Sequence, residues 1–299
     1  MPADRLAALV DPDVVPVLLA DGFGFTEGPV WVAAEQCLLF SDMPGDTRWR
    51  WSERDGCQPV ASPTFKGNGM CLDRDGHLLV CEQVSSCLVR LRGERRELVA
   101  FHYGGRYLNS PNDVVVRGVD GSIYFTDPPY GRMYSTGGWI RSRDLEFAGV
   151  FRVAPGGGDV DLVVGEDEFD GPNGLCFSPD ESVLYVNDSD RHLVRAFDVA
   201  ADGSLSRGRV LIDGVGGGPG DAIVDGMECD ELGNVWVTGP GGVWVIDPHG
   251  ERIGVVETPE TCTSLSWGGA DMRTLFLTTT TTLHSLATLV GPSPLPPAR

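Results

Sequence analysis

Polar residues recur along the chain at comparable places, each beside a glycine or an aspartate and ahead of a short apolar run. They are Glu27, Asn68, Asn112, Asn173 and Asp225, at intervals of roughly 40 to 60 residues, with a degenerate sixth copy at Thr263. Their carboxylate and amide oxygens are the ligands that hard cations prefer, and calcium accepts them in loose geometry. If Glu27, Asn112, Asn173 and Asp225 converge, they form a divalent-cation site built only from oxygen ligands.

The segment after each of these residues has the pattern of a β-hairpin. After Asn112, three valines at 114–116 are followed by a turn at Asp120-Gly121 and a second apolar run at 123–125. Such paired runs, rich in β-branched and aromatic residues, are typical of hairpins. Four strands with their turns need about 40 to 50 residues, which is the period of one propeller blade. Six copies predict an all-β fold, a six-bladed β-propeller whose inner strands bring the polar residues to a central metal-binding channel.

A simpler interpretation is that these pairs are only turn punctuation. Asn-Gly and Asp-Gly are ordinary turn residues that tolerate positive φ. One such pair alone would carry no argument. Six in register, with a polar residue kept at the same position, favour a shared site.

The remaining segments fit around one domain at 23–286. Residues 1–22 predict a short helix and a strand at 14–19, which would pair with the last blade and remove an exposed sheet edge. An insertion at 132–147 is expected to form a loop at the mouth of the channel. The glycine-rich stretch 216–221 and the tail 287–299 are expected to be a flexible loop and a poorly ordered extension. Asp73 to Gly76 resembles the start of a calcium-binding loop, but its twelfth position is Val84, so we interpret it as a turn.

Composition excludes several classes of protein. The chain has 23 basic and 43 acidic residues, a net charge of −20, which argues against a nucleic-acid partner. Neither a signal peptide nor an apolar stretch long enough for a membrane span is evident. Eight cysteines without a Cys-x-x-Cys pair predict free thiols in a reduced, cytoplasmic protein. The absence of Gly-x-Ser-x-Gly and of His-Glu-x-x-His argues against an α/β-hydrolase and a zincin site.

Several strings resemble one known family. FTEGPVW, GNGMCLD, LNSPNDVVV, YFTDPPYG, GPNGLCFSPD and DGMECDELGNVWV are similar to the gluconolactonase / senescence marker protein (regucalcin) family, which includes luciferin-regenerating enzymes. The resemblance covers about Phe23 to Thr278 and looks closest to bacterial gluconolactonase-like members. It implies a six-bladed propeller with one divalent cation in its channel, calcium as first choice, with magnesium, manganese or zinc as alternatives.

The resemblance also implies roles for individual residues. Glu27, Asn173 and Asp225 would bind the metal, and Asp225 would be the catalytic carboxylate as well. Asn112 would be a further ligand or a substrate contact. Further substrate contacts are expected from Asn68, Asp113 and Tyr130.

Two departures from the family bear on substrate preference. Many relatives have Glu-His where this chain has Glu82-Gln83. The senescence marker branch has an arginine where this chain has Ser110, and Arg106 is the nearest candidate to replace it.

The expected activity is a calcium-dependent lactonase that opens the ring of a small sugar-acid lactone, with Asp225 as general base or as nucleophile. A phosphotriesterase or fluorophosphatase on the same site is one alternative. A non-enzymic propeller with a structural calcium, binding a partner through its faces, is another. A monomer or weak homodimer is expected.

Overall fold

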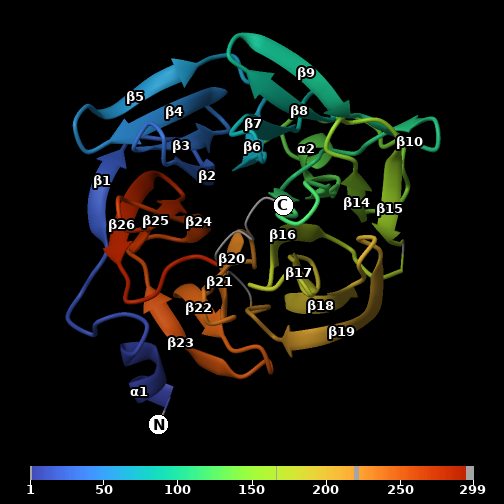
Figure 1. The fold of residues 1–299 in the computed structure, drawn as a ribbon. Coiled ribbons are helices and arrows are strands. Elements are labelled where there is room, and N and C mark those ends of the chain that lie inside the picture. Colours follow the sequence, from blue (N-terminus) through green and yellow to red (C-terminus); the bar gives the residue numbers. More distant parts are fainter. Residues whose placement is uncertain (1, 166, 219–221, 294–299) are drawn as a thin grey trace.

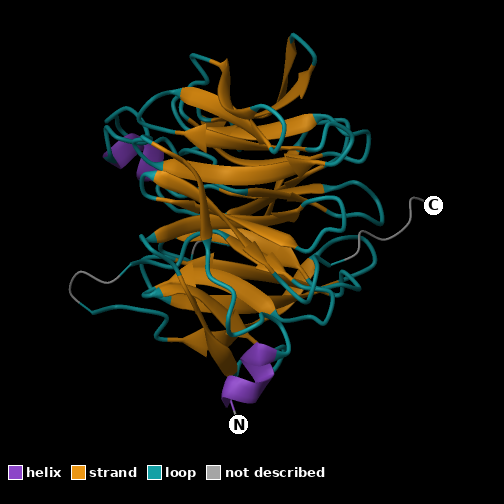
Figure 2. Ribbon diagram, turned by 90° about the vertical axis from the view of Figure 1, so that its left-hand side faces the viewer, coloured by secondary structure: helices purple, strands orange, loops and turns teal. Residues whose placement is uncertain are grey.

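The computed structural model describes residues 2–165, 167–218 and 222–293. Within them, six four-stranded antiparallel sheets are arranged in a ring, as Figure 1 shows, which confirms the predicted six-bladed propeller. Figure 2 shows the disc edge-on, built almost entirely of strands. The described residues contain two short helices, α1 (Pro2–Ala7) and α2 (Tyr130–Met133).

Each blade begins at the channel and ends at the rim. Blade one contains β2 (Thr26–Val32), β3 (Cys37–Asp42), β4 (Thr47–Ser52) and β5 (Gly56–Ala61); blade two contains β6 (Gly67–Leu72), β7 (Leu78–Glu82), β8 (Cys87–Arg92) and β9 (Arg95–Ala100). Blade three contains β12 (Val114–Val116), β13 (Ile123–Thr126), β14 (Val150–Val153) and β15 (Val160–Val164); blade four contains β16 (Pro172–Phe177), β17 (Val183–Asp188), β18 (Leu193–Val199) and β19 (Leu205–Asp213). Blade five contains β20 (Met227–Cys229), β21 (Val235–Gly239), β22 (Gly242–Ile246) and β23 (Arg252–Glu257); blade six contains β24 (Cys262–Gly268), β25 (Thr274–Thr279) and β26 (Thr282–Ala287). A small hairpin, β10 (His102–Tyr103) with β11 (Arg106–Tyr107), was not predicted.

The N-terminal segment closes the ring as expected. Strand β1 (Val17–Asp21) pairs antiparallel with β26 and becomes the outer strand of blade six (Figure 1). The strand was predicted at 14–19 and begins three residues later, at Val17. Helix α1 is tied to the rim of blade five, where the Arg5 guanidinium lies 2.6 Å from Asp247.

The C-terminal segment differs from the predicted free extension. Val290 is buried, and Ser293 N donates to the carbonyl of Cys229 at 2.8 Å. Thr288 Oγ1 accepts a hydrogen bond from Trp267 Nε1 at 3.1 Å. Residues 287–293 are therefore packed against blades five and six. The end of the tail, 294–299, and residues 219–221 of the glycine-rich stretch lie outside the described part.

The glycines beside the recurring polar residues serve the close approach of neighbouring inner strands. A Cβ at Gly174 would lie 2.3 Å from the carbonyl oxygen of Asp225, and one at Gly28 would lie 2.2 Å from that of Asn68. No side chain fits there, because real Cβ contacts are not that short. Both glycines lie within strands, β16 and β2, and not in turns, although Gly28 also has the positive φ that favours glycine, +54°.

Candidate functional site

A cavity of about 320 Å³ lies at the end of the channel where the inner strands begin. Six of the seven predicted site residues line it: Glu27, Asn68, Asn112, Tyr130, Asn173 and Asp225. They come from blades one to five, so the propeller brings together residues that lie far apart in the sequence. Asp113 is the exception.

Two carboxyl groups, Glu27 and Asp225, adjoin one another at the base of this cavity. Burial raises the pKa of Glu27 well above its ordinary value, and the neighbouring Asp225 adds to the rise. Burial likewise raises the pKa of Asp225 to about 7, while a hydrogen bond with Asn173 opposes that rise. Two buried acids held this close disfavour a double negative charge unless a cation joins them.

The donor set at the base of the cavity fits a hard divalent cation. Asn173 Nδ2 donates to Ser189 Oγ at 3.0 Å, which fixes the orientation of the amide. The side chain of Asn112 is buried, and among the described residues it has no hydrogen-bond partner. Glu27, Asn112, Asn173 and Asp225 thus offer two carboxylates and two amide oxygens, the ligand types that suit calcium.

Three aspartates that the sequence analysis left without a role hold the loops leading to these residues. Each accepts hydrogen bonds from two consecutive backbone N–H groups. The donors to Asp42 are Gly24 and Phe25. The donors to Asp127 are Asn109 and Ser110, and the donors to Asp188 are Asp170 and Gly171. Each pair of donors lies three and two residues before Glu27, Asn112 or Asn173. The sequence signal was a Ser-Asp, Thr-Asp or Asn-Asp pair at the end of the second strand of blades one, three and four.

The predicted insertion forms part of the wall of the cavity. Tyr134, Thr136 and Gly137 line it, which confirms that the insertion lies at the mouth of the channel. The apolar residues Phe25, Met43, Pro44 and Ile223 also line the cavity. The wall is therefore apolar over much of its area, while the base is polar.

Tyr130 and Asp190 form a polar pair on this wall. The Tyr130 hydroxyl donates to Asp190 Oδ1 at 3.2 Å and lies 3.4 Å from the carbonyl of Gly171. Burial, followed by the nearby charge of Asp190, raises the pKa of the Tyr130 phenol. The phenol therefore stays protonated and serves as a hydrogen-bond donor at neutral pH.

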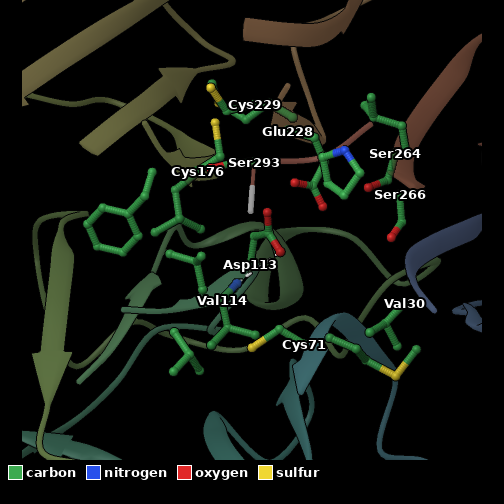
Figure 3. Close-up of a pocket in the computed structure, with 18 of the residues that line it drawn as sticks. Val30, Cys71, Asp113, Val114, Cys176, Glu228, Cys229, Ser264, Ser266 and Ser293 are labelled. Atoms are coloured by element: carbon green, nitrogen blue, oxygen red, sulfur yellow. Dashed lines mark hydrogen bonds between the residues drawn. The ribbon is translucent and has the colours of Figure 1, made fainter. Parts of the chain in front are cut away.

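Asp113 lies in a second cavity, of about 170 Å³, further along the channel. Figure 3 shows its carboxyl group beside that of Glu228, with Cys71, Cys176 and Ser264 around them. Burial raises the pKa of Asp113 to about 7 and that of Glu228 to about 8. Asp113 was predicted as a substrate contact, but the structure does not bring it together with the other six.

The two positions that depart from the family have different surroundings. Ser110 is buried and structural, since its Oγ donates to the carbonyl of Pro128 at 2.6 Å and accepts from Gly131 N at 3.0 Å. Arg106 lies on β11, is exposed and donates to the carbonyl of Asp144, so it does not line the cavity. Gln83 does line it.

The turn at Asp73 gathers Asp73, Asp75 and His77 at the surface. Asp73 Oδ1 accepts hydrogen bonds from the backbone N–H groups of Asp75 and His77, and Asp73 Oδ2 pairs with Arg90 at 2.7 Å. These bonds explain the cluster as a turn, as predicted.

Comparisons with known proteins agree with this architecture. The profile of the SMP-30/Gluconolactonase/LRE-like region matches residues 25–281. The chain belongs to this family. A gluconolactonase of Zymomonas mobilis subsp. mobilis is 32% identical over 277 residues, covering 84% of this chain and 75% of that protein.

Solved structures show the same fold. A gluconolactonase from Xanthomonas campestris has a TM-score of 0.85 and 32% identity, with 95% of this chain and 92% of that chain covered. Regucalcin from Agrobacterium tumefaciens, described as a calcium-binding protein, has a TM-score of 0.76 and 20% identity over 96% of this chain and 98% of that chain. Among the described residues, no helix is long and apolar enough to cross a membrane.

Proposed function

We propose that this protein is a divalent-cation-dependent lactonase that opens the ring of a sugar-acid lactone, with calcium as its ion. The observation that carries the proposal is the convergence of Glu27, Asn112, Asn173 and Asp225 at the base of one cavity. Membership of a family that contains gluconolactonases supports the reaction class. The calcium-binding regucalcin structure supports the choice of ion.

A bound cation would supply Lewis-acid polarisation of the lactone carbonyl. Glu27, Asn112, Asn173 and Asp225 would hold it. Asp225 takes a proton from water as the water oxygen bonds to the carbonyl carbon. It then returns that proton to the ring oxygen as the carbon–oxygen bond breaks, giving the open-chain hydroxy acid.

The surrounding residues orient the substrate and limit access of water. Tyr130 presents a protonated hydroxyl to the cavity, held by Asp190. The apolar wall of Phe25, Met43 and Ile223 covers one side of the bound ring and displaces water there. The eight free cysteines support a reducing compartment, and we infer a cytoplasmic location.

The test is acid release from glucono-δ-lactone by chelator-stripped protein, with and without added calcium and corrected for spontaneous hydrolysis. We expect calcium to restore turnover, and Asp225→Asn to abolish it. Glu53→Gln, an exposed carboxylate away from the cavity, is the matched control. Calcium-independent turnover, or a fully active Asp225→Asn, would refute the proposal.

Isotope labelling tests whether Asp225 attacks the lactone carbonyl itself or acts as a general base. A single turnover in heavy-oxygen water labels the Asp225 side chain only if it attacks the carbonyl and forms an acyl intermediate. Labelled product with an unlabelled protein excludes only an acyl intermediate that water opens at the Asp225 carbonyl carbon; it is expected both for a general base and for an intermediate opened at the substrate carbonyl carbon.

A further inference from the structure

Three buried amides face the cavity without a partner in the protein. Asn68, Gln83 and Asn112 are only 3%, 2% and 6% exposed. All three line the cavity, and no side-chain hydrogen bond joins any of them to another described residue. None of their amide atoms is among the fully enclosed polar atoms that lack a partner, so these groups are accessible from the cavity. A ligand that enters the cavity can therefore hydrogen-bond with all three.

The chemistry of these amides matches hydroxyl groups. An amide has both a donor and an acceptor, as does a hydroxyl, so each can bond a sugar hydroxyl in either direction. A cationic side chain would instead match a phosphate, sulfonate or carboxylate.

Cationic side chains are missing from the lining. Among the described residues that line the cavity, the charged ones are Glu27, Asp190 and Asp225, all acidic. The stretch 219–221, outside the described part, reads Pro-Gly-Asp and contains no basic residue. One divalent cation would offset the two carboxylates at the base and leave Asp190 at the rim.

Three basic side chains that contact lining residues or lie close to them in the sequence are engaged in hydrogen bonds with backbone carbonyls. Arg132 is buried and donates to the carbonyls of Leu108 and Asn109, at 2.6 and 2.5 Å. Arg141 donates to the Gln83 carbonyl at 2.9 Å, and Lys66 Nζ donates to the Pro44 carbonyl at 2.8 Å. An anionic substrate group could pair with one of these three side chains only by breaking such a contact.

We propose that the cavity is selective for uncharged, hydroxyl-bearing lactones and rejects lactones that carry a second, anionic group. This inference rests on the proposed lactonase function and names its substrate class. Burying an anion beside carboxylates without a cationic partner is strongly unfavourable, whereas the three amides bind neutral hydroxyls.

The first test compares kcat/KM for glucono-δ-lactone with that for the same lactone phosphorylated on its terminal hydroxyl, at saturating calcium. We expect the phosphorylated lactone to be worse by about 100-fold or more. Values within tenfold of each other would overturn the inference and leave the lactonase proposal intact. No turnover of either lactone would refute the lactonase proposal and this inference with it.

A gain-of-charge variant tests whether the rejection is electrostatic. Thr136 is exposed and lies on the wall contributed by the insertion, so Thr136→Arg adds a cation without disturbing the core. Thr136→Gln is the control for added length. We expect the arginine variant to reduce the discrimination about tenfold and the glutamine variant to preserve it; equal discrimination in both would overturn the electrostatic argument.

A substitution of Gln83 tests whether the amides bind the hydroxyl groups of the substrate. Gln83→Met keeps the length of the side chain and removes both hydrogen-bonding groups. We expect kcat/KM for glucono-δ-lactone to fall about 10- to 100-fold relative to that for δ-valerolactone, which has no hydroxyl groups. The ratio between the two substrates cancels any general loss of folding or metal, so an unchanged ratio would overturn this part.

Discussion

Ser110 N donates a hydrogen bond to Asp127 Oδ1 at 2.8 Å, and the adjacent Asn109 N donates to Oδ2 at 2.7 Å. Asp127 directly follows β13, the second strand of blade three, and the two donors precede Asn112 by two and three residues. The aspartate therefore sets the path of the loop that delivers Asn112 to the cavity. Asp188 acts in the same way on Gly171, ahead of Asn173.

Replacing Asp127 should weaken metal binding although this residue does not line the cavity. Asp127→Asn turns one acceptor oxygen into a donor that faces a backbone N–H, so the loop must shift. We expect the Kd for calcium to rise about 10- to 100-fold, as for other residues that orient metal ligands. Calorimetric titration measures this. Asp202→Asn, in an exposed turn where Asp202 likewise caps a backbone N–H, should bind calcium like the wild type. Equal affinity in both variants would contradict the positioning role.

The close approach of the inner strands gives a second prediction. A Cβ at Gly174 would lie 2.3 Å from the Asp225 carbonyl oxygen, so Gly174→Ala forces blades four and five apart. Overpacking of this kind costs about 1–3 kcal/mol in the free energy of unfolding. Gly156→Ala, where the added methyl group meets open space, should change stability little. Urea unfolding of the two variants compares them directly, and equal midpoints would show that the strands can adjust.

The repeat made most of the site predictable. In a propeller, residues at the same register of successive inner strands converge, so the spacing of Glu27, Asn112, Asn173 and Asp225 predicted one cavity. Asp113 lines the other cavity, because consecutive residues of extended chain point in opposite directions and Asn112 already faces the first cavity. The role of Asp127 could not be predicted, because it depends on the path of an irregular loop. The packing of Val290 was not predicted, because the few apolar residues of a Pro-rich tail give no periodic signal.

Glu260 should make stability depend on pH in the acid range. Partial burial raises the pKa of Glu260, but hydrogen bonds to its carboxylate outweigh that effect and hold the pKa below the ordinary 4.5. The donors are Thr281 N, Thr281 Oγ1 and Thr279 Oγ1. A lowered folded pKa means that the stabilisation is present above the unfolded pKa and is lost as pH falls through the folded one. Wild type should therefore be more stable than Glu260→Gln at pH 7, and the difference should shrink below about pH 4.5. Urea midpoints across pH measure this; a difference independent of pH would contradict it.

Glu27 should stabilise the calcium-bound protein and destabilise the calcium-free one. Burial and the neighbouring carboxyl group raise the pKa of Glu27, and burial raises that of Asp225 to about 7, so without a cation the fold at pH 7 must either take up a proton or hold two buried charges. Glu27→Gln keeps the size of the side chain and removes this cost. We expect the calcium-free variant to melt about 2–4 °C above the calcium-free wild type, which corresponds to about 1 kcal/mol.

Calcium at 100 times its Kd should stabilise the wild type by about 2.7 kcal/mol and the Glu27→Gln variant hardly at all. Thermal melting with and without calcium, with Glu53→Gln as control, measures both effects. A variant that calcium stabilises as much as the wild type would show that Glu27 does not bind the ion.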